Sequence, residues 1–369
     1  MNLDSNRPQS SGLEGVVAAE TRLSDVDGER GRLTIAGHDV EHLGLAATYE
    51  DAFALLESGA LPDATGRERT RAALGQARAQ AFALLPRLGD ALELSDGMDA
   101  LRTALAHVQP GAQGGLSESM RVVGAVSLFA ATWARRAAGL SPQPPDPARA
   151  TASDFLRLVR DREPSAAEVQ ALEAYWVTVC DHGMNASTFA ARVVASTGSD
   201  RVSALVAALG ALKGPLHGGA PGPVLDMLDA VSSPKNAERW LEAELGAGRR
   251  IMGMGHRIYR VRDPRAAVLE KAIERLEQAG ASSGRLSLAR AVERAAVGVL
   301  RARHPDRPLH ANVEFYTAVL LDSVGLPRSL FSPAFAVGRV LGWSAHFDEQ
   351  RATGRLIRPA SRYVGPKPS

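Results

Sequence analysis

The chain has 369 residues, of which 45% are hydrophobic but only 5% aromatic, and 43 Lys and Arg residues stand against 41 Asp and Glu residues. The resulting net charge of +2 provides no overall basic field, which argues against nucleic acid as a partner. The single cysteine, Cys180, excludes an intrachain disulfide framework, and we interpret it as a buried thiol. No signal peptide and no apolar run near ~20 residues is present, so we expect a cytoplasmic protein that does not enter membranes.

The N-terminal region carries the one β signal of the chain. Residues 1–11 are polar and are expected to be disordered. Residues 15–40 predict a small hairpin, with Val16 and Val17 before a turn at 25–28 and a second strand around Leu33 to Ile35. After the hairpin, abundant Ala and Leu with few aromatic residues favour closely packed helices. We therefore assign the chain to the all-α class.

Helix starts recur along the rest of the chain, and the proline-rich stretch 141–150 predicts a loop between two of them. A capping residue followed three positions later by an acid, or directly by proline, is typical of a helix N-terminus. Such starts are predicted at Thr48 with Asp51, Thr151 with Asp154, Ser165 with Glu168, Ser233 with Pro234 and Asp263 with Pro264.

Three segments in the second half set a histidine or a carboxylate among turn-forming residues. They are G-P-L-H-G-G-A at 214–220, G-M-G-H-R-I-Y-R-V-R-D-P-R at 253–265 and N-V-E-F-Y at 312–316. A neutral histidine can donate to a developing enolate or alkoxide, and a carboxylate can take a carbon-bound proton. His217, His256 and Glu314 are therefore chemically complete for carbon–carbon bond formation through an enolised thioester.

Each of these residues also has a structural interpretation. His217 would then only stabilise a tight turn, and Glu314 would only complement the dipole at a helix start. Arg265, in the first helical turn where the dipole favours acids, either faces solvent or binds an anion. Arg260 either contacts an anion or, with Arg257 and Arg262 nearby, forms a solvated basic face.

Two other functional classes fit parts of this pattern. Three histidines and a glutamate would ligate zinc, but no H-x-x-H or H-E-x-x-H spacing occurs and Cys180 has no second cysteine, so no metal is expected. A non-catalytic helical interaction protein is the second alternative, and it predicts histidines with structural roles only.

The three segments, together with D-H-G-M-N-A-S-T-F at 181–189, F-A-V-G-R at 335–339 and L-I-R-P at 356–359, resemble citrate synthases. The resemblance runs in the family's order from about Gly12 through nearly the whole chain. It implies a two-domain helical fold, with a large domain of 12–218 plus 326–369 and a small domain of 219–325.

The resemblance also implies a role for each candidate residue. Glu314 would be the base that deprotonates acetyl-CoA, His217 the donor to the thioester carbonyl, and His256 the donor to the carbonyl of oxaloacetate. The groups that would hold oxaloacetate are His182, Arg265, Arg339 and Arg358, whereas Arg260 and Arg257 would contact coenzyme A. No cofactor is implied, and the working unit would be a homodimer in which Arg358 serves the partner's site.

The chain departs from the family at three places. Many members carry aspartate where this chain has Glu314, a histidine where it has Val179, and Asn-Glu where it has Pro221 and Gly222. The close alternative is a 2-methylcitrate synthase that uses propionyl-CoA. One methylene in an apolar pocket is worth only about 1–3 kcal/mol, so these motifs do not separate the two activities.

Overall fold

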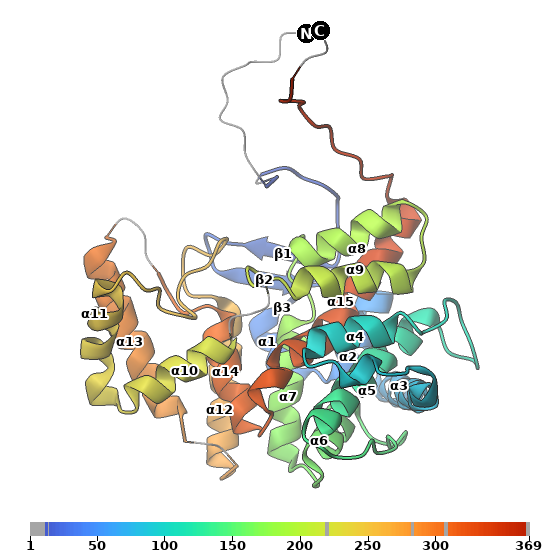
Figure 1. Ribbon diagram of the computed structural model, residues 1–369, viewed down its shortest axis with the longest axis horizontal. Coiled ribbons are helices and arrows are strands. Elements are labelled where there is room, and N and C mark those ends of the chain that lie inside the picture. The colour runs from blue at the N-terminus through green and yellow to red at the C-terminus, as the bar shows by residue number, and fades with distance from the viewer. Residues whose placement is uncertain (1–11, 14, 218–220, 282–283, 306–308, 367–369) are drawn as a thin grey trace.

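The computed structural model describes residues 12–13, 15–217, 221–281, 284–305 and 309–366, so the predicted disordered tail 1–11 lies outside the described residues. Within these ranges the chain forms fifteen α-helices and one small three-stranded sheet (Figure 1). The all-α class is therefore confirmed.

The sheet lies near the N-terminus, but its strands differ from the prediction. Strands β1 (Ser24–Asp27), β2 (Arg32–Ile35) and β3 (His38–Asp39) pair antiparallel in the order β1-β2-β3. Residues 25–27, predicted as a turn, belong to β1. The chain reverses after them, at residues 28–31, where Gly31 has a φ of 62°. Val16 and Val17 lie outside the strands and stay exposed, so they bury no surface that would stabilise a strand.

The helices follow in two groups. The first group and the last helix are α1 (Val40–Ala46), α2 (Tyr49–Ser58), α3 (Ala64–Phe82), α4 (Gly97–Leu105), α5 (Glu118–Ala137), α6 (Thr151–Arg160), α7 (Ala166–Val179), α8 (Ala186–Ser196), α9 (Arg201–Leu212) and α15 (Phe331–Thr353). The second group is α10 (Pro221–Val231), α11 (Ala237–Gly246), α12 (Pro264–Gln278), α13 (Leu286–Arg303) and α14 (Val313–Ser323). Short 3₁₀ turns occur at Leu85–Arg87, Ala91–Glu93, Pro234–Asn236 and Arg328–Leu330.

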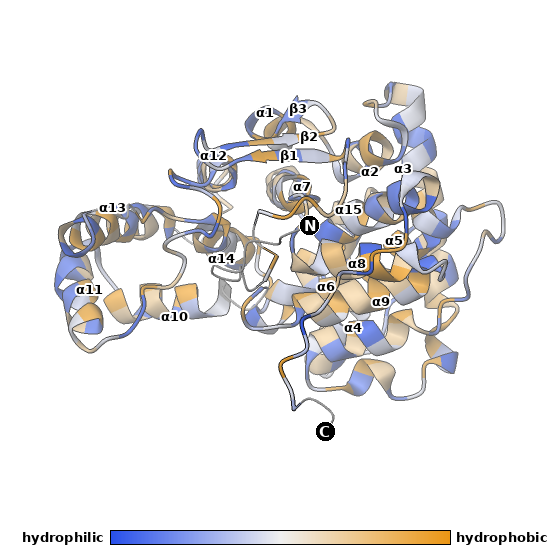
Figure 2. Ribbon diagram, turned by 90° about the horizontal axis from the view of Figure 1, so that it is seen from above, coloured by the Kyte–Doolittle hydropathy of each residue, from blue (hydrophilic) through white to orange (hydrophobic). Residues whose placement is uncertain are grey.

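Figures 1 and 2 show that α10, α11 and α13 lie together at one side of the molecule, while α12 and α14 lie between them and the remaining helices. Helices α5, α7 and α15 are buried along most of their length, and Cys180 after α7 is fully buried, as predicted. No helix in the described ranges is both long and apolar enough to cross a bilayer.

The predicted helix starts are only partly correct. Thr48 and Ser165 form the predicted capping boxes with Asp51 and Glu168, and Asp263 caps α12. The prediction at Thr151 is wrong, because Thr151 is itself the first residue of α6 and donates from its main-chain N–H and its hydroxyl to Glu50, at 2.7 and 2.8 Å.

The remaining predicted starts also differ from local caps. Asp154 pairs with Arg78 at 3.2 Å, so buried partners replace the local cap that was predicted for Thr151 and Asp154. Ser233 makes no side-chain cap, and Pro234 starts a 3₁₀ turn instead of an α-helix. The proline-rich stretch 141–150 contains no helix, as predicted.

Helix α15 approaches the end of α7 closely because two of its residues are glycines. The main-chain N–H of Gly342 donates to the carbonyl of Cys180 at 3.1 Å, and a Cβ at position 342 would lie 2.3 Å from that oxygen. A Cβ at Gly338 would lie 2.8 Å from Val179 Cγ2. These two positions therefore set how closely α15 packs beneath the segment that carries His182.

The first prediction tests this contact. Gly342→Ala should destabilise the protein by about 1–3 kcal/mol, because the added methyl group meets main-chain atoms in a packed interior. Gly298→Ala is the matched control, since Gly298 lies within α13 and no atom lies within 4 Å of the place that its Cβ would take, and it should stabilise by about 0.5–1 kcal/mol. Urea denaturation measures both changes, and equal stabilisation by the two substitutions would contradict the close packing.

Candidate active site

Four segments that are far apart in the sequence contribute to one cluster of buried titratable side chains. His182 follows α7, Arg265 lies in the first turn of α12, Glu314 in the first turn of α14, and Arg339 within α15. His182, Arg265 and Arg339 are only 6%, 4% and 1% exposed. Titratable side chains this deeply buried are uncommon unless they are paired or functional.

The loop before α12 is held against the segment before α14. Gly255 N–H donates to the carbonyl of His310 at 2.7 Å, and Asn312 N–H donates to the carbonyl of Gly253 at 2.9 Å. Gly253 and Gly255 have φ of 74° and 84°, which other residues adopt at a cost. This pairing brings His256 close to the helix start that carries Glu314.

Asp263 joins the two helix starts and orients Arg265. Its carboxylate accepts from the main-chain N–H of Arg265 at 3.0 Å and from Arg265 Nε and Nη2 at 3.0 and 2.8 Å. The same carboxylate accepts from the main-chain N–H of Val313 at 3.1 Å. Arg265 therefore points inward, and the solvent-facing alternative for this residue is wrong.

His256 is held as a neutral donor. Its Nδ1 accepts from the main-chain N–H groups of Ile258 and Tyr259, both at 3.0 Å, so the ring hydrogen of the neutral form is on Nε2. Burial and the neighbouring Arg265 lower the pKa of His256 to about 4. Its Nε2 lies 3.3 Å from Arg265 Nη2, so two donors lie side by side and one acceptor oxygen can bind both of them.

His182 lies beside this pair. The His182 and His256 rings are 5.7 Å apart, and Tyr259 contacts both rings, with its hydroxyl 3.0 Å from His182 Nε2. Burial, followed by the charges of Arg265 and Arg339, holds the pKa of His182 well below its usual value. His182 is therefore neutral at pH 7.

His217 lies after α9 and contacts the start of α8. Its Nε2 is 2.8 Å from Ser187 Oγ and receives the main-chain N–H of Ser187 at 3.3 Å. Burial and then Arg339 lower the pKa of His217 to about 4, so this imidazole is also neutral. The Gly218-Gly219-Ala220 part of the motif lies outside the described residues.

Glu314 has the features expected of a base. Burial raises its pKa to about 7, against the opposing charges of Arg265 and Arg339. Its Oε2 is buried and has no hydrogen-bond partner among the described residues. A carboxylate that titrates near neutral pH and has a free lone pair is suited to proton abstraction.

Arg339 is the charge that the three titratable groups share. It influences His182, His217 and Glu314, while its Nε donates to the carbonyl of Val179 at 2.5 Å and its guanidinium lies 4.7 Å from the centre of the Phe335 ring. Burial lowers the pKa of Arg339 to about 10. No carboxylate of the described residues forms an ion pair with it, so it is available for an anionic ligand.

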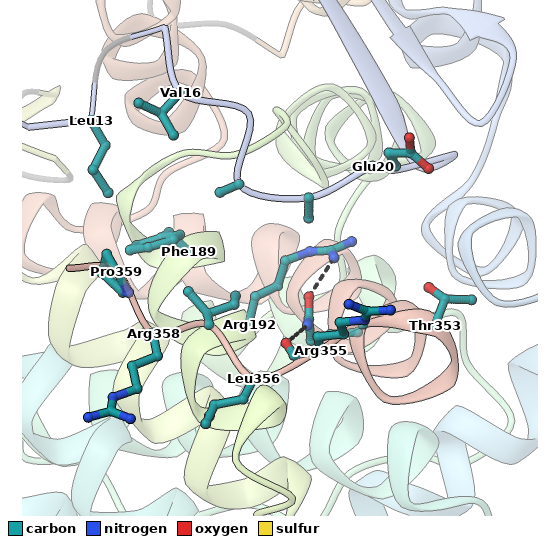
Figure 3. Close-up of a pocket in the computed structure, with 15 residues that line it drawn as sticks. Leu13, Val16, Glu20, Phe189, Arg192, Thr353, Arg355, Leu356, Arg358 and Pro359 are labelled. Carbon is teal, nitrogen blue, oxygen red and sulfur yellow. Dashed lines mark hydrogen bonds between the residues drawn. The ribbon is translucent and has the colours of Figure 1, made fainter. Parts of the chain in front are cut away.

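Arg358 is not brought to this cluster within its own chain. It is exposed in the extended C-terminal tail and lines a cavity together with the N-terminal segment, α8 and the end of α15. Figure 3 shows its guanidinium directed away from Arg192, which also lines that cavity. Six of the seven predicted catalytic and oxaloacetate-binding residues are therefore gathered, and Arg358 lies apart.

Arg257 and Arg260 are exposed on the loop that carries His256. The main-chain N–H of Arg260 donates to the carbonyl of Gly28 at 2.9 Å, which links this loop to the turn between β1 and β2. Arg262 is not part of a free basic face, because it pairs with Glu270 and Glu293, both at 2.8 Å.

The sequence motifs did not identify several residues that support the cluster. Arg192 Nε donates to His346 Nδ1 at 2.9 Å, so the ring hydrogen of His346 is on Nε2. This Nε2 lies 3.2 Å from the carboxylate of Asp181, the residue that precedes His182 in the chain. Ser24 also donates to Asp181. A signal was present, because Arg339, Trp343, His346 and Gln350 recur at spacings of four, three and four and so share one face of α15.

Within the described ranges, no three His, Cys, Asp or Glu side chains are grouped in a way that would hold a metal ion. The cluster instead offers neutral imidazole donors, two buried guanidinium groups and a carboxylate with a raised pKa. Such a set can bind a small dianion and move a proton from carbon.

Comparison with known proteins places the chain in a family. The family model for the citrate synthase C-terminal domain matches residues 12–360. The citrate synthase of Haloferax volcanii is 35% identical, with 96% of each chain covered. The crystal structure of citrate synthase from Thermotoga maritima gives a TM-score of 0.83 at 33% identity, covering 98% of this chain and 97% of that one.

A second solved structure is similar over a comparable length. It is the ternary complex of the Thermoplasma acidophilum citrate synthase with carboxymethyl coenzyme A and oxaloacetate, with a TM-score of 0.86 at 27% identity and coverage of 99% of this chain and 98% of that one. Together with the family match and the gathered residues, these similarities show that the chain belongs to the citrate synthase family and is an acyltransferase.

Proposed function

We propose that this protein is a citrate synthase, which condenses acetyl-CoA with oxaloacetate and hydrolyses citryl-CoA to citrate and coenzyme A. The observation that carries the proposal is Glu314, a half-buried residue whose Oε2 is buried and has no hydrogen-bond partner among the described residues, and whose pKa is raised to about 7 beside two buried arginines. The Thermoplasma relative, solved with oxaloacetate and a coenzyme A analogue, supports the choice of substrates. No cofactor or metal enters the proposed reaction.

The first chemical step is proton abstraction at the methyl carbon of the thioester. Glu314 accepts the proton, and His217 donates a hydrogen bond to the thioester oxygen as it becomes an enolate. Since the pKa of His217 is about 4, the donor is the neutral imidazole, whose own acidity is closer to that of an enol than an imidazolium would be.

In the second step the enolate carbon attacks the carbonyl carbon of oxaloacetate, and the electron pair of the C=O bond moves to its oxygen, which becomes the hydroxyl of the product after protonation. His256 Nε2–H and Arg265 Nη2, 3.3 Å apart, form the pair of donors for the ligand's oxygens. Arg265 and Arg339 neutralise its carboxylates, and His182 adds a further hydrogen bond. Arg257 and Arg260 contact coenzyme A from the exposed side of the same loop.

We also propose that 12–218 with 326–369 form the large domain and that 219–325 form the small domain. Tyr259 meets His182 and Arg260 meets Gly28 across the proposed boundary, so both contacts would change if the domains moved. Because Arg265 and His256 belong to one part and Arg339 and His182 to the other, oxaloacetate would draw the two together.

The first test compares acyl donors. With oxaloacetate present, kcat/KM for acetyl-CoA should exceed kcat/KM for propionyl-CoA by about 10–200-fold, the range that one methylene group provides. Release of the coenzyme A thiol measures the rate, and mass spectrometry identifies the product. A preference for propionyl-CoA would assign the protein as a 2-methylcitrate synthase, and no thiol release with either donor would contradict the proposed activity.

The second test concerns the base. Glu314→Gln should lower kcat by about 10²–10⁴-fold, because an amide cannot accept the proton, while calorimetry should still detect oxaloacetate binding. Glu314→Asp should retain part of the activity, since it keeps the carboxylate. Near wild-type turnover in Glu314→Gln would mean that another group removes the proton.

The pH dependence provides a third, independent test. Only the deprotonated carboxylate of Glu314 is active, so kcat/KM for acetyl-CoA should fall tenfold per pH unit below a midpoint of about 7 and level off above it. The carboxylates of bound oxaloacetate can only move this midpoint upward. His217 and His256, with pKa values of about 4, add no change near neutral pH. A midpoint near 4.5, the usual value for glutamate, would contradict the assignment.

The last test in this group addresses assembly. We propose a two-fold homodimer in which Arg358 of the partner subunit completes each site, because the exposed tail does not reach the site of its own chain. Arg358→Ala and His217→Ala chains should each be nearly inactive. After subunit exchange, a random equal mixture should recover about a quarter of wild-type activity, since half the dimers are mixed and each has one intact site of two. No recovery, or an active monomer, would contradict the arrangement.

A further inference from the structure

Trp343 contacts the support of His217 although no sequence motif includes it. It is fully buried on α15, four residues after Arg339. Its indole Nε1–H donates to Ser187 Oγ at 3.1 Å, and Ser187 Oγ lies 2.8 Å from His217 Nε2. The indole is thus one side chain away from the imidazole.

The hydrogen-bond capacities of these groups restrict where the protons lie. Indole is a donor only, so Ser187 Oγ must accept from Trp343 and direct its own proton elsewhere. The two other neighbours of the hydroxyl are Asn185 Oδ1 at 2.8 Å and His217 Nε2. Asn185 Oδ1 already accepts the main-chain N–H groups of Ser187 and Thr188, both at 3.1 Å.

The main chain favours His217 as the acceptor. The N–H of Ser187, which donates to Asn185 Oδ1 at 3.1 Å, is shared with His217 Nε2 at 3.3 Å, and this second contact favours a lone pair on that nitrogen. If Nε2 accepts, the hydrogen of the neutral ring is on Nδ1, the nitrogen that remains for the thioester. A donor on Nδ1 is the tautomer that the proposed reaction needs.

We propose that Trp343 is a positioning residue that, through Ser187, holds His217 as the Nδ1–H tautomer. The effect on turnover rests on the proposed function, because it requires His217 to act in the reaction. The effect on the tautomer of His217 does not. Donation by the indole polarises the hydroxyl, which makes it a stronger donor to the imidazole. Without that donation the hydroxyl is a weaker donor and both of its lone pairs are open, so acceptance from Nε2–H becomes more favourable and the two tautomers become closer in energy.

Two other buried tryptophans show what a purely structural indole does in this protein. Trp133 donates to the main-chain carbonyl of Leu94 at 2.9 Å, and Trp176 donates to that of Ala334 at 2.8 Å. Trp343 instead donates to a side chain that contacts a proposed catalytic residue. Trp133, at 3% exposure, therefore provides a control with the same chemistry and similar burial.

The test measures the His217 tautomer in Trp343→Phe, which removes the donor and keeps an aromatic ring. Two-bond ¹⁵N–¹H spectra of protein labelled at histidine report which ring nitrogen carries hydrogen, and loss of the signal in His217→Ala identifies it among the nine histidines. Trp343→Phe should shift His217 from Nδ1–H towards Nε2–H, whereas Trp133→Phe should leave it unchanged. An unchanged tautomer in Trp343→Phe overturns the proposal, whatever the activity.

The rate of turnover gives a second readout, which depends on the proposed reaction as well as on the tautomer. In Trp343→Phe, kcat should fall about three- to tenfold with little change in KM for oxaloacetate, because His217 acts on the acyl donor. In a Ser187→Ala background the same substitution should have no further effect, since the connection is already broken. Additive losses overturn the proposal. If the wild-type protein has no condensation activity, the proposed function fails while the tautomer measurement still decides the role of Trp343.

Because Trp343→Phe also leaves a small void, a second variant preserves the shape. Benzothienylalanine at position 343 replaces the indole N–H by sulfur and keeps both rings, so it removes the hydrogen bond without a cavity. It should reproduce the tautomer shift of Trp343→Phe at near wild-type thermal stability. A normal tautomer in this variant would attribute the Trp343→Phe effect to packing and overturn the proposal.

Discussion

The candidate site depends on the carboxylate of Asp263 more than on any other single group. This one side chain, 1% exposed, caps α12, orients Arg265 through two hydrogen bonds and accepts the first N–H of α14. Removing one member of a buried ion pair costs about 3–5 kcal/mol, because the other charge is left in a poorly polarisable interior. The side chain of Arg265 points inward because it donates two hydrogen bonds to the carboxylate of Asp263. The same contact fixes the start of the helix that carries Glu314, so a group that binds no substrate sets the positions of two that would.

Helix α15 provides the corresponding support from the other side. Its residues 339, 343, 346 and 350 lie on one face. Gly338 and Gly342, which are also part of α15, have no side chain, and this allows the helix to approach α7 and the segment 180–187. Arg339 thereby reaches the carbonyl of Val179, Trp343 reaches Ser187, and His346 reaches Asp181. A side-chain hydrogen bond is geometrically demanding, whereas apolar packing tolerates small shifts. The closely spaced polar contacts therefore explain how a helical scaffold holds short loops in defined positions.

The sequence predicted the class of fold from its composition and pointed to the six gathered residues through the segments that resemble citrate synthases. It did not predict the roles of residues whose partners are distant in the chain. Thr151 has the local pattern of a cap, yet it bonds to Glu50, about a hundred positions earlier. Asp263 was identified only as a cap, since the Val313 contact depends on tertiary pairing of two loops. The strand limits were missed because alternation in 24–35 is short and the register depends on Leu33 and Ile35 reaching the core.

The buried positive charges and neutral donors of the site would suit a ligand with two negative charges. Arg339 has no carboxylate partner in the described residues, its pKa is lowered by burial, and His182 and His217 are kept neutral partly by its charge. Each of these groups would gain favourable interaction from a bound dianion. Glu314 would not, because a nearby anion raises the pKa of a carboxyl group further. The two buried arginines therefore have two effects: they would attract the proposed dianion, and they limit the rise that burial causes in the pKa of Glu314, which is about 7. A base that remained far below this value would be too weak to take a proton from carbon, and one far above it would be protonated at neutral pH.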